Sequence, residues 1–256
     1  MPGICLITGG ARGIGAATAR LVARDGLAVA IGYRERADAA QALAREIEAA
    51  GGRAAPVKGD VASEADIVAL FDATEASLGP VTHLVNSAGI SVNAKVHDFD
   101  AAAIAHLMQV NVIGLMLCCR EAVRRMPAQL PEGGGSIVNV SSMAATIGGR
   151  AGASAYAASK AAVDAFTTGF AKEVAKQNIR VNAVRPGMTR TDMTADRLND
   201  PAIEAQLSAT IAMHRVGEAH EIAEAIRWLL SPAASFISGA HLDASGGGFI
   251  IGERQD

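Results

Sequence analysis

The chain has 256 residues, of which 50% are hydrophobic and 19% are charged, which suits the core of one α/β domain. A net charge of -3, with lysines and arginines scattered along the chain, argues against a nucleic-acid partner and predicts a small-molecule one. Three cysteines cannot form a disulfide framework, and we recognise neither a charged leader nor an apolar run of membrane-spanning length, so we expect a cytoplasmic protein without membrane partners.

The chain opens with a predicted strand, a glycine-rich turn and a helix. Residues 4–8 are a continuous apolar run with β-branched side chains, which predicts a strand buried on both faces. The turn could let a pyrophosphate approach the backbone and the first N–H groups of the helix at 16–25. Glycine turns also end many strands that bind nothing, so the turn alone is a weak indication of a dinucleotide. Its candidate ligands are Gly9, Arg12, Gly13, Ile14 and Gly15.

The predicted second strand, residues 27–33, ends at Tyr33 and Arg34. In dinucleotide-binding folds this strand end meets the adenosine ribose, where an acid suits the 2′-hydroxyl of NAD and an arginine suits the 2′-phosphate of NADP. No carboxylate occupies the strand end itself, although Glu35 follows, and Arg12 could reach the same phosphate. We therefore expect NADP rather than NAD, which stays possible; a solvated loop charge is the alternative role of Arg34.

The third and fourth predicted strands also end in candidate cofactor contacts. The third, residues 53–58, precedes Asp60 and Val61, and Asp60 is either an adenine contact or a cap of its own loop. The fourth, residues 81–85, is closed by Asn86, Ser87, Ala88 and Gly89. Helical stretches separate the strands, at residues 16–25, 37–50, 63–78, 100–126, 154–176 and 218–230. This alternation predicts a parallel sheet with right-handed crossovers.

Two predicted helices carry polar groups in informative positions. Asn111 lies in the middle of the apolar helix at 100–126, where an inward amide must find hydrogen-bond partners or destabilise the fold. In the helix at 154–176, Tyr156 and Lys160 stand four residues apart and share one helix face. An adjacent ammonium lowers the pKa of a phenol, although most tyrosine and lysine pairs at this spacing are ordinary surface residues.

The last part of the chain completes a single predicted domain. A sixth strand at 179–184 is followed by Pro186 and Gly187, and a final strand is predicted at 239–243. The pattern loosens over residues 187–212, which we interpret as a substrate lid, with a variable surface segment as the alternative.

Taken in order, these segments resemble the short-chain dehydrogenases/reductases over essentially the whole chain. Several short motifs at family-like separations are far more specific than any one of them. The motifs are the cofactor loop at 8–15, the segment 86–89, the helix asparagine Asn111, the catalytic segment Tyr156 to Lys160, and the nicotinamide contact at Pro186, Gly187, Thr189 and Thr191.

The resemblance implies a doubly wound, Rossmann-type α/β sheet with strand order 3-2-1-4-5-6-7 and the reversible oxidation of an alcohol with NAD(P), without a metal. In such an enzyme Ser142 orients the carbonyl oxygen and Tyr156 is the general acid in reduction. Lys160 contacts the nicotinamide ribose and lowers the pKa of Tyr156, while Asn111 helps to hold a water that relays protons. Members of the family commonly form homotetramers, which we expect here.

The serine assignment is a choice between neighbours. The fifth predicted strand, residues 136–140, delivers Ser141 and Ser142, but the spacing from Ser142 to Tyr156 is one residue longer than the commonest family pattern. The common spacing would select Met143, which cannot donate a hydrogen bond. We assign Ser142, with the extra residue absorbed among the following glycines, and Ser141 is the runner-up.

The resulting hypothesis is an NADP(H)-dependent oxidoreductase that interconverts a carbonyl and a secondary alcohol. The rivals are an NADP-binding sensor without turnover and an enzyme of the same fold that dehydrates or epimerises its substrate. A mostly small and apolar predicted pocket admits sugars, β-ketoacyl thioesters, diketones or cyclic ketones. Arg150 and Arg190 either attract an anionic substrate or are solvated surface charges. The apolar segment 249–251 packs either on a partner subunit or on its own chain.

Overall fold

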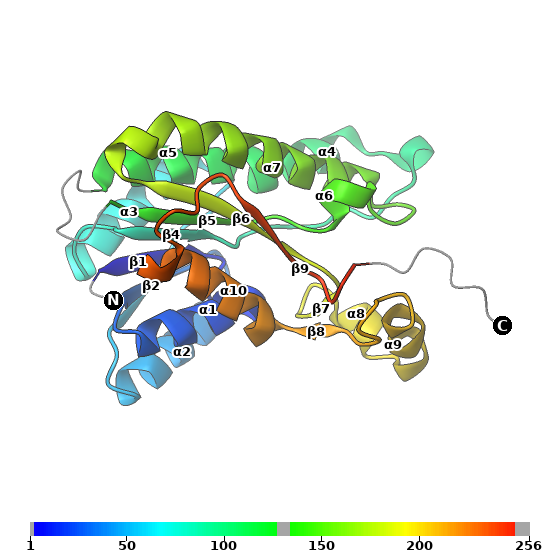
Figure 1. Cartoon of the computed structure of the whole chain (residues 1–256), viewed down its shortest axis with the longest axis horizontal. Helices are drawn as coiled ribbons and strands as arrows, with labels where there is room; N and C mark the ends of the chain where they lie inside the picture. The colour runs from blue at the N-terminus through cyan, green and yellow to red at the C-terminus, as the bar shows by residue number, and fades with distance from the viewer. Residues whose placement is uncertain (1–2, 127–133, 249–256) are drawn as a thin grey trace.

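A seven-stranded parallel sheet forms the centre of the molecule, in a computed structural model that describes residues 3–126 and 134–248 (Figure 1). Its strand order is β3-β2-β1-β4-β5-β6-β9, which confirms the predicted order with β9 as the seventh strand. The strands are β1 (Ile4–Thr8), β2 (Ala28–Tyr33), β3 (Ala54–Lys58), β4 (His83–Asn86), β5 (Ser136–Val140), β6 (Arg180–Pro186) and β9 (His241–Ala244).

Helices cover both faces of this sheet (Figure 1). On one face lie α1 (Gly13–Arg24), α2 (Ala37–Ala49) and α10 (Ala219–Leu230). On the other lie α3 (Glu64–Ser77), α4 (Ala101–Met108), α5 (Leu115–Arg125), α6 (Ala144–Ile147) and α7 (Ser154–Val174). Short 3₁₀ turns occur at Val96–Asp98, Ala175–Gln177 and Pro232–Ala234.

Because helices shield both faces, the central strands are apolar on both sides, as the sequence predicts. All five residues of β1 are buried. Cys5 and Ile7 join the cluster under α1, α2 and α10, whereas Leu6 joins the cluster under α3, α5 and α7. The free thiols of Cys5, Cys118 and Cys119 are also buried, and burial raises the pKa of Cys118 to about 12. They are therefore packing residues rather than reactive ones.

The helix predicted at 100–126 forms with one irregularity. A π-helical segment, Gln109–Gly114, separates α4 from α5 and contains Asn111. The continuous run Ala101–Arg125 is long and apolar enough to cross a membrane on length and composition, which corrects the expectation that no such run exists. Part of this run packs inside the fold, with Leu107 and Leu115 among its buried side chains.

The segment 187–212 is folded rather than loose. It contains β7 (Thr189–Arg190), α8 (Ala195–Leu198) and α9 (Pro201–Ser208), and β7 pairs with β8 (Gly217–Glu218) in a separate two-stranded sheet. Leu198, Leu207 and Val216 form a small core of their own. This segment projects beyond the main sheet next to the ends of β6 and β9 (Figure 1).

Candidate active site

A cavity of about 650 Å³ opens at the carboxyl ends of β1, β4, β5 and β6. Thr8, Ser87, Ser141 and Pro186, at or just after these strand ends, all line it. In an open parallel sheet, ligands bind at this edge where the strand order reverses, here between β1 and β4. The topology therefore brings together the residues that the sequence singles out in four separate segments.

The glycine-rich turn forms a close-fitting wall of this cavity. Gly9 has a φ of +64°, and a Cβ added there would lie 2.9 Å from Ala88 Cα. A Cβ on Gly15 would lie 2.4 Å from the Gly9 carbonyl oxygen, so glycine lets α1 begin directly against the turn. Gly13 and Ile14, in the first turn of α1, line the cavity. The helix dipole and free N–H groups there suit an anionic pyrophosphate, so these residues fit a dinucleotide.

A cationic group marks the end of β2. Arg34 lines the cavity beside Tyr33, and its guanidinium lies 2.7 Å from Glu35 and 3.8 Å from Asp60. Asp60 Oδ1 also accepts a hydrogen bond from Ala62 N at 2.9 Å, so the loop-capping role is present. Arg34 is thus a partly exposed cation that two carboxylates contact, and its role toward a 2′-phosphate stays a prediction.

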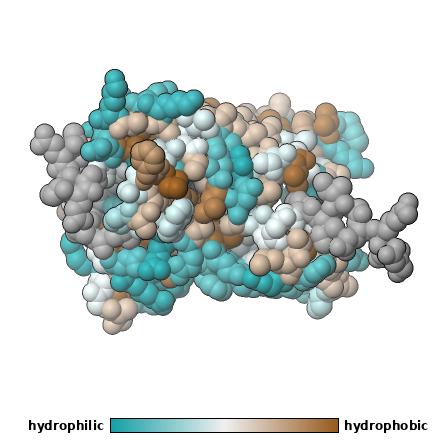
Figure 2. All heavy atoms as spheres, in the orientation of Figure 1, coloured by the Kyte–Doolittle hydropathy of each residue, from teal (hydrophilic) through white to brown (hydrophobic). Residues whose placement is uncertain are grey.

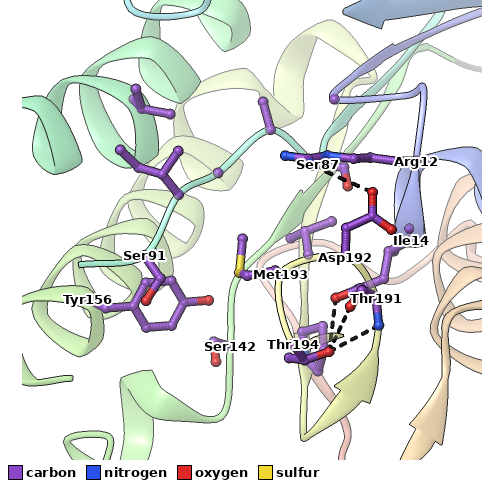
Figure 3. A pocket seen from close by; sticks show the side chains of 18 of the residues that line it. Arg12, Ile14, Ser87, Ser91, Ser142, Tyr156, Thr191, Asp192, Met193 and Thr194 are labelled. Atoms are coloured by element: carbon purple, nitrogen blue, oxygen red, sulfur yellow. Dashed lines mark hydrogen bonds and ion pairs between the residues drawn. The ribbon is translucent and has the colours of Figure 1, made fainter. Parts of the chain in front are cut away.

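The second predicted arginine reaches across the cavity. Arg12 forms a 3.6 Å ion pair with Asp192, which joins the glycine-rich turn to the segment after β7 (Figure 3). Thr194 organises that segment: its hydroxyl donates to Thr189 O at 2.7 Å and accepts from Thr191 N at 3.0 Å. Thr189 and Thr191 line the cavity, as expected of nicotinamide contacts.

Tyr156 and Lys160 face the cavity from the first turns of α7. The Lys160 side chain is buried, and its Nζ donates to Val140 O at 2.8 Å and lies 5.9 Å from the centre of the Tyr156 ring. Burial lowers the pKa of Lys160 to about 8, although Asp164 acts in the opposite direction.

Burial raises the pKa of Tyr156, and only the Ser142 hydroxyl opposes this effect. The net shift is thus upward, since desolvation of the phenolate dominates, and the lowering by Lys160 that the resemblance implied stays a prediction.

The two candidate serines differ in what each hydroxyl contacts. Ser141 is buried and its Oγ donates to Lys160 O at 3.2 Å, whereas Ser142 Oγ accepts from Ala144 N at 3.1 Å and faces Tyr156 (Figure 3). In the loop between α6 and α7, Gly148, Gly149 and Gly152 have φ of +75°, +78° and +86°, so this loop has the glycine conformations expected to absorb the extra residue.

Asn111 lies behind the cavity wall instead of lining it. Its Oδ1 accepts from Ile90 N at 2.9 Å, and its Nδ2 donates to Ile90 O at 2.9 Å and to Ser159 Oγ at 3.0 Å. Ser159 Oγ in turn donates to Tyr156 O at 2.7 Å. The amide is thus bonded to protein groups and joins α7 to the segment after β4, and the water expected at Asn111 stays a prediction.

Asn86 is a second buried amide outside the cavity. Its Nδ2 donates to Asn139 Oδ1 at 2.9 Å, and Asn139 Nδ2 donates to Thr167 Oγ1 at 2.9 Å. This network ties β4 to β5 and α7, which fits a strand-stabilising role and not a cofactor contact.

Of the predicted site residues, the structure places all but three on the cavity wall; the exceptions are Gly15, Asn86 and Asn111. Arg190 does not line it either and forms ion pairs with Glu204 and Glu218. Sequence reasoning missed several lining residues, because 187–212 lacks a periodic pattern that separates inward from outward side chains. The missed polar ones include Asp192, Thr194, Asp196 and Arg197 within that segment, and Arg36 and Asn93 outside it.

Comparison with known proteins agrees with this geometry. Residues 9–248 match the sequence family described as enoyl-(acyl carrier protein) reductase. The chain is 44% identical to the uncharacterized oxidoreductase YgfF of Escherichia coli (strain K12) over 245 residues, which are 95% of this chain and 99% of that protein.

The chain belongs to the short-chain dehydrogenase/reductase family.

Two further members of the family show what kinds of ligand it accommodates. The cis-4-hydroxycyclohexanecarboxylate dehydrogenase of Sinomonas cyclohexanicum is 41% identical, with 95% of each chain covered. A short-chain dehydrogenase from Burkholderia cenocepacia J2315, solved in complex with NADP, superposes with a TM-score of 0.87 at 37% identity, covering 95% of this chain and 96% of that one. The protein is therefore an oxidoreductase of a family that uses NAD(P).

Proposed function

We propose that this protein is an NADP(H)-dependent oxidoreductase that interconverts a carbonyl and a secondary alcohol, with Tyr156 as general acid and base. The observation that carries the proposal is one cavity with Ser142, Tyr156 and Lys160 on its wall and a glycine cradle and Arg34 elsewhere on the same wall. A screen of NADPH depletion against ketones, sugars and acyl thioesters tests it directly. Failure to oxidise NADPH with any carbonyl compound would refute it.

The proposed mechanism needs a hydride and a proton. The nicotinamide, when bound, exchanges the hydride with the substrate carbon. In reduction, the Tyr156 hydroxyl gives its proton to the substrate oxygen as the carbon gains the hydride, and in oxidation the phenolate takes that proton back. Ser142 donates a hydrogen bond to the same oxygen, and the Lys160 ammonium stabilises the phenolate that remains. The raised pKa of Tyr156 keeps the proton in place near neutral pH, which suits reduction.

The two rival functions make less use of these residues. A sensor that only binds NADP needs no acid beside the nicotinamide, so the grouping of Ser142 with Tyr156 favours turnover. A dehydratase or epimerase would consume no net NADPH. Stoichiometric conversion of NADPH and ketone to NADP and alcohol separates the proposed activity from both.

The proposed role of Lys160 makes the reaction pH-dependent. Its pKa of about 8 means that it is protonated below that pH and neutral above it. We expect kcat/KM for reduction to hold below about pH 8 and to fall above it, since neutral lysine no longer stabilises the phenolate. The measurement is a pH profile with a ketone and saturating NADPH, spanning roughly two units on each side of this pKa. Asp164→Asn, which removes a charge that raises the pKa, should move the break to lower pH; an unchanged break would contradict this account.

The proposed preference for NADP depends on the arginine at the end of β2. We expect Arg34→Ala to weaken NADPH binding by roughly tenfold or more, because a charge-assisted contact to the 2′-phosphate is lost. NADH binding should change much less, and fluorescence titrations with both cofactors measure the ratio. Arg45→Ala, an exposed arginine on α2 away from the cavity, is the matched control. Equal losses for NADPH and NADH in the Arg34 variant would rule out 2′-phosphate recognition.

The lid and the assembly complete the proposal. The segment 187–212, which contributes Met188 and Met193 to the cavity wall, covers the substrate. Trp228 and Phe236 are exposed, and apolar atoms gather on the face where α10 and β9 lie (Figure 2). This face supports a homotetramer, which sedimentation of the purified protein would test. The segment 249–251, expected to pack on a partner subunit or on its own chain, lies outside the described residues.

A further inference from the structure

Two arginines from different segments converge on the cavity that contains the proposed catalytic groups. Arg150 comes from the loop between α6 and α7, and Arg197 comes from α8 in the proposed lid. Both line the cavity together with Ser142 and Tyr156. Both therefore border one cavity, Arg150 from the loop between α6 and α7 and Arg197 from the lid.

Neutral oxygens help to orient both guanidinium groups. Arg150 Nη2 donates to Thr210 Oγ1 at 3.3 Å, and Arg197 Nη2 donates to Asn93 Oδ1 at 3.4 Å. Within the two described ranges, no carboxylate of another residue lies at ion-pair distance from Arg197. A guanidinium held by a single amide oxygen retains donors for a ligand.

The other arginines around this cavity are arranged differently. Arg12 is paired with Asp192, and Arg34 is paired with Glu35. Arg190, the lid arginine that points away from the cavity wall, is held between two glutamates. Within the lid, carboxylates thus pair with Arg190, which does not line the cavity, whereas Arg197 lines the cavity.

The two cavity arginines also influence each other. Partial burial lowers the pKa of Arg150, and the positive charge of Arg197 lowers it further. Like charges that approach in a partly desolvated space repel, and an anion between them removes that repulsion. Asp196, next to Arg197 on α8, lines the cavity as well, so the three side chains together carry one net positive charge.

We propose that Arg150 and Arg197 bind a carboxylate of the substrate, so that the physiological substrate is a carbonyl or alcohol compound bearing a carboxylate. Arg197, which has no carboxylate at ion-pair distance within the described ranges, supplies a positive charge that attracts an anion. The planar guanidinium groups also match the geometry of a carboxylate. The assignment rests on the proposed function for the reacting end of the substrate, whereas the anion site itself can be tested without turnover.

The test compares cyclohexanecarboxylate with cyclohexanecarboxamide by titration calorimetry, using the full chain with and without saturating NADP. Both molecules have the same ring, and only the first carries a charge. We expect the carboxylate to bind roughly tenfold tighter or more, as charge-assisted hydrogen bonds predict. Arg197→Gln and Arg150→Gln should each shrink this ratio, and Asp196→Asn should increase it. Arg45→Gln changes the net charge by the same amount at an exposed position that does not line the cavity, so it should leave the ratio unchanged.

Equal affinities for the two molecules, or a preference that survives in the double Arg150→Gln and Arg197→Gln variant, would overturn the proposal. Inorganic phosphate that competes more strongly than the carboxylate would also overturn it. Reduction of 4-oxocyclohexanecarboxylate and its carboxamide with NADPH is measured in parallel. If neither is reduced, the NADPH-depletion screen finds no other carbonyl substrate and the binding ratio holds, the proposed function fails and the anion site stands. If both are reduced equally well and the ratio is one, the anion site fails and the proposed function stands.

Discussion

Tyr156→Phe is expected to lower kcat by roughly 100-fold to 10,000-fold, the range that a positioned acid contributes. Phenylalanine keeps the ring that faces the cavity but has no proton to give to the substrate oxygen. The buried surroundings raise the pKa of Tyr156 and keep the wild-type hydroxyl protonated. The substitution therefore removes the proton that reduction uses. Single-turnover reduction of a ketone under saturating NADPH measures the loss.

NADPH binding to the same variant provides the control. The glycine turn, Arg34 and the Lys160 contact to Val140 O do not involve the phenol oxygen, so the affinity for NADPH should stay within a few-fold of wild type. A variant that binds NADPH and reduces the ketone at the wild-type rate would remove Tyr156 from the mechanism. Loss of NADPH binding together with turnover would instead indicate damage to the fold.

Ser142→Ala is expected to lower kcat by roughly 100-fold, the effect of removing one hydrogen-bond donor from a developing charge. The Ser142 hydroxyl acts on the phenol of Tyr156 and lines the cavity, so its loss removes a donor from the reacting oxygen. Ground-state binding contributes less, and KM should change little. Steady-state kinetics with one ketone separates kcat from KM.

The neighbouring serine is a matched comparison for this prediction. Ser141 is buried and donates to the backbone carbonyl of Lys160, so Ser141→Ala should mainly lower the free energy of unfolding, by about 1 kcal/mol. Denaturant unfolding measures that change. If Ser141→Ala reduced kcat more than Ser142→Ala, the assignment of the substrate-holding serine would have to be exchanged.

Much of the fold could be predicted because each strand is marked locally. β1 and β5 are short apolar runs closed by turn residues, and the helices between strands are separated by glycine, proline or capping residues such as Ser63. The resemblance then supplied the strand order, which alternation alone does not specify. The irregular parts were less predictable: the π-helical segment around Asn111 and the short elements of 187–212 depend on tertiary partners.

The candidate site divides in the same way. The sequence predicts which residues supply the site, because catalysis and phosphate binding require particular side chains at particular spacings. These residues are Gly9, Ser142, Tyr156 and Lys160. The sequence does not predict the direction of the pKa shift of Tyr156, since that direction depends on how many atoms of other segments surround the phenol. For the same reason, the sequence alone treated Arg150 and Arg190 alike.

The sequence by itself determined the class of fold, the family and the chemical groups available for hydride and proton transfer, because local patterns and the order of the motifs specify them. Only the tertiary structure decided that the Ser141 hydroxyl donates to Lys160 O while the Ser142 hydroxyl acts on Tyr156, that Asn111 bonds Ile90 behind the cavity wall, and that Arg150 and Arg197, but not Arg190, line the cavity. These outcomes depend on contacts between segments far apart in the chain, and neither composition nor spacing encodes which side of a loop or short helix faces a cavity.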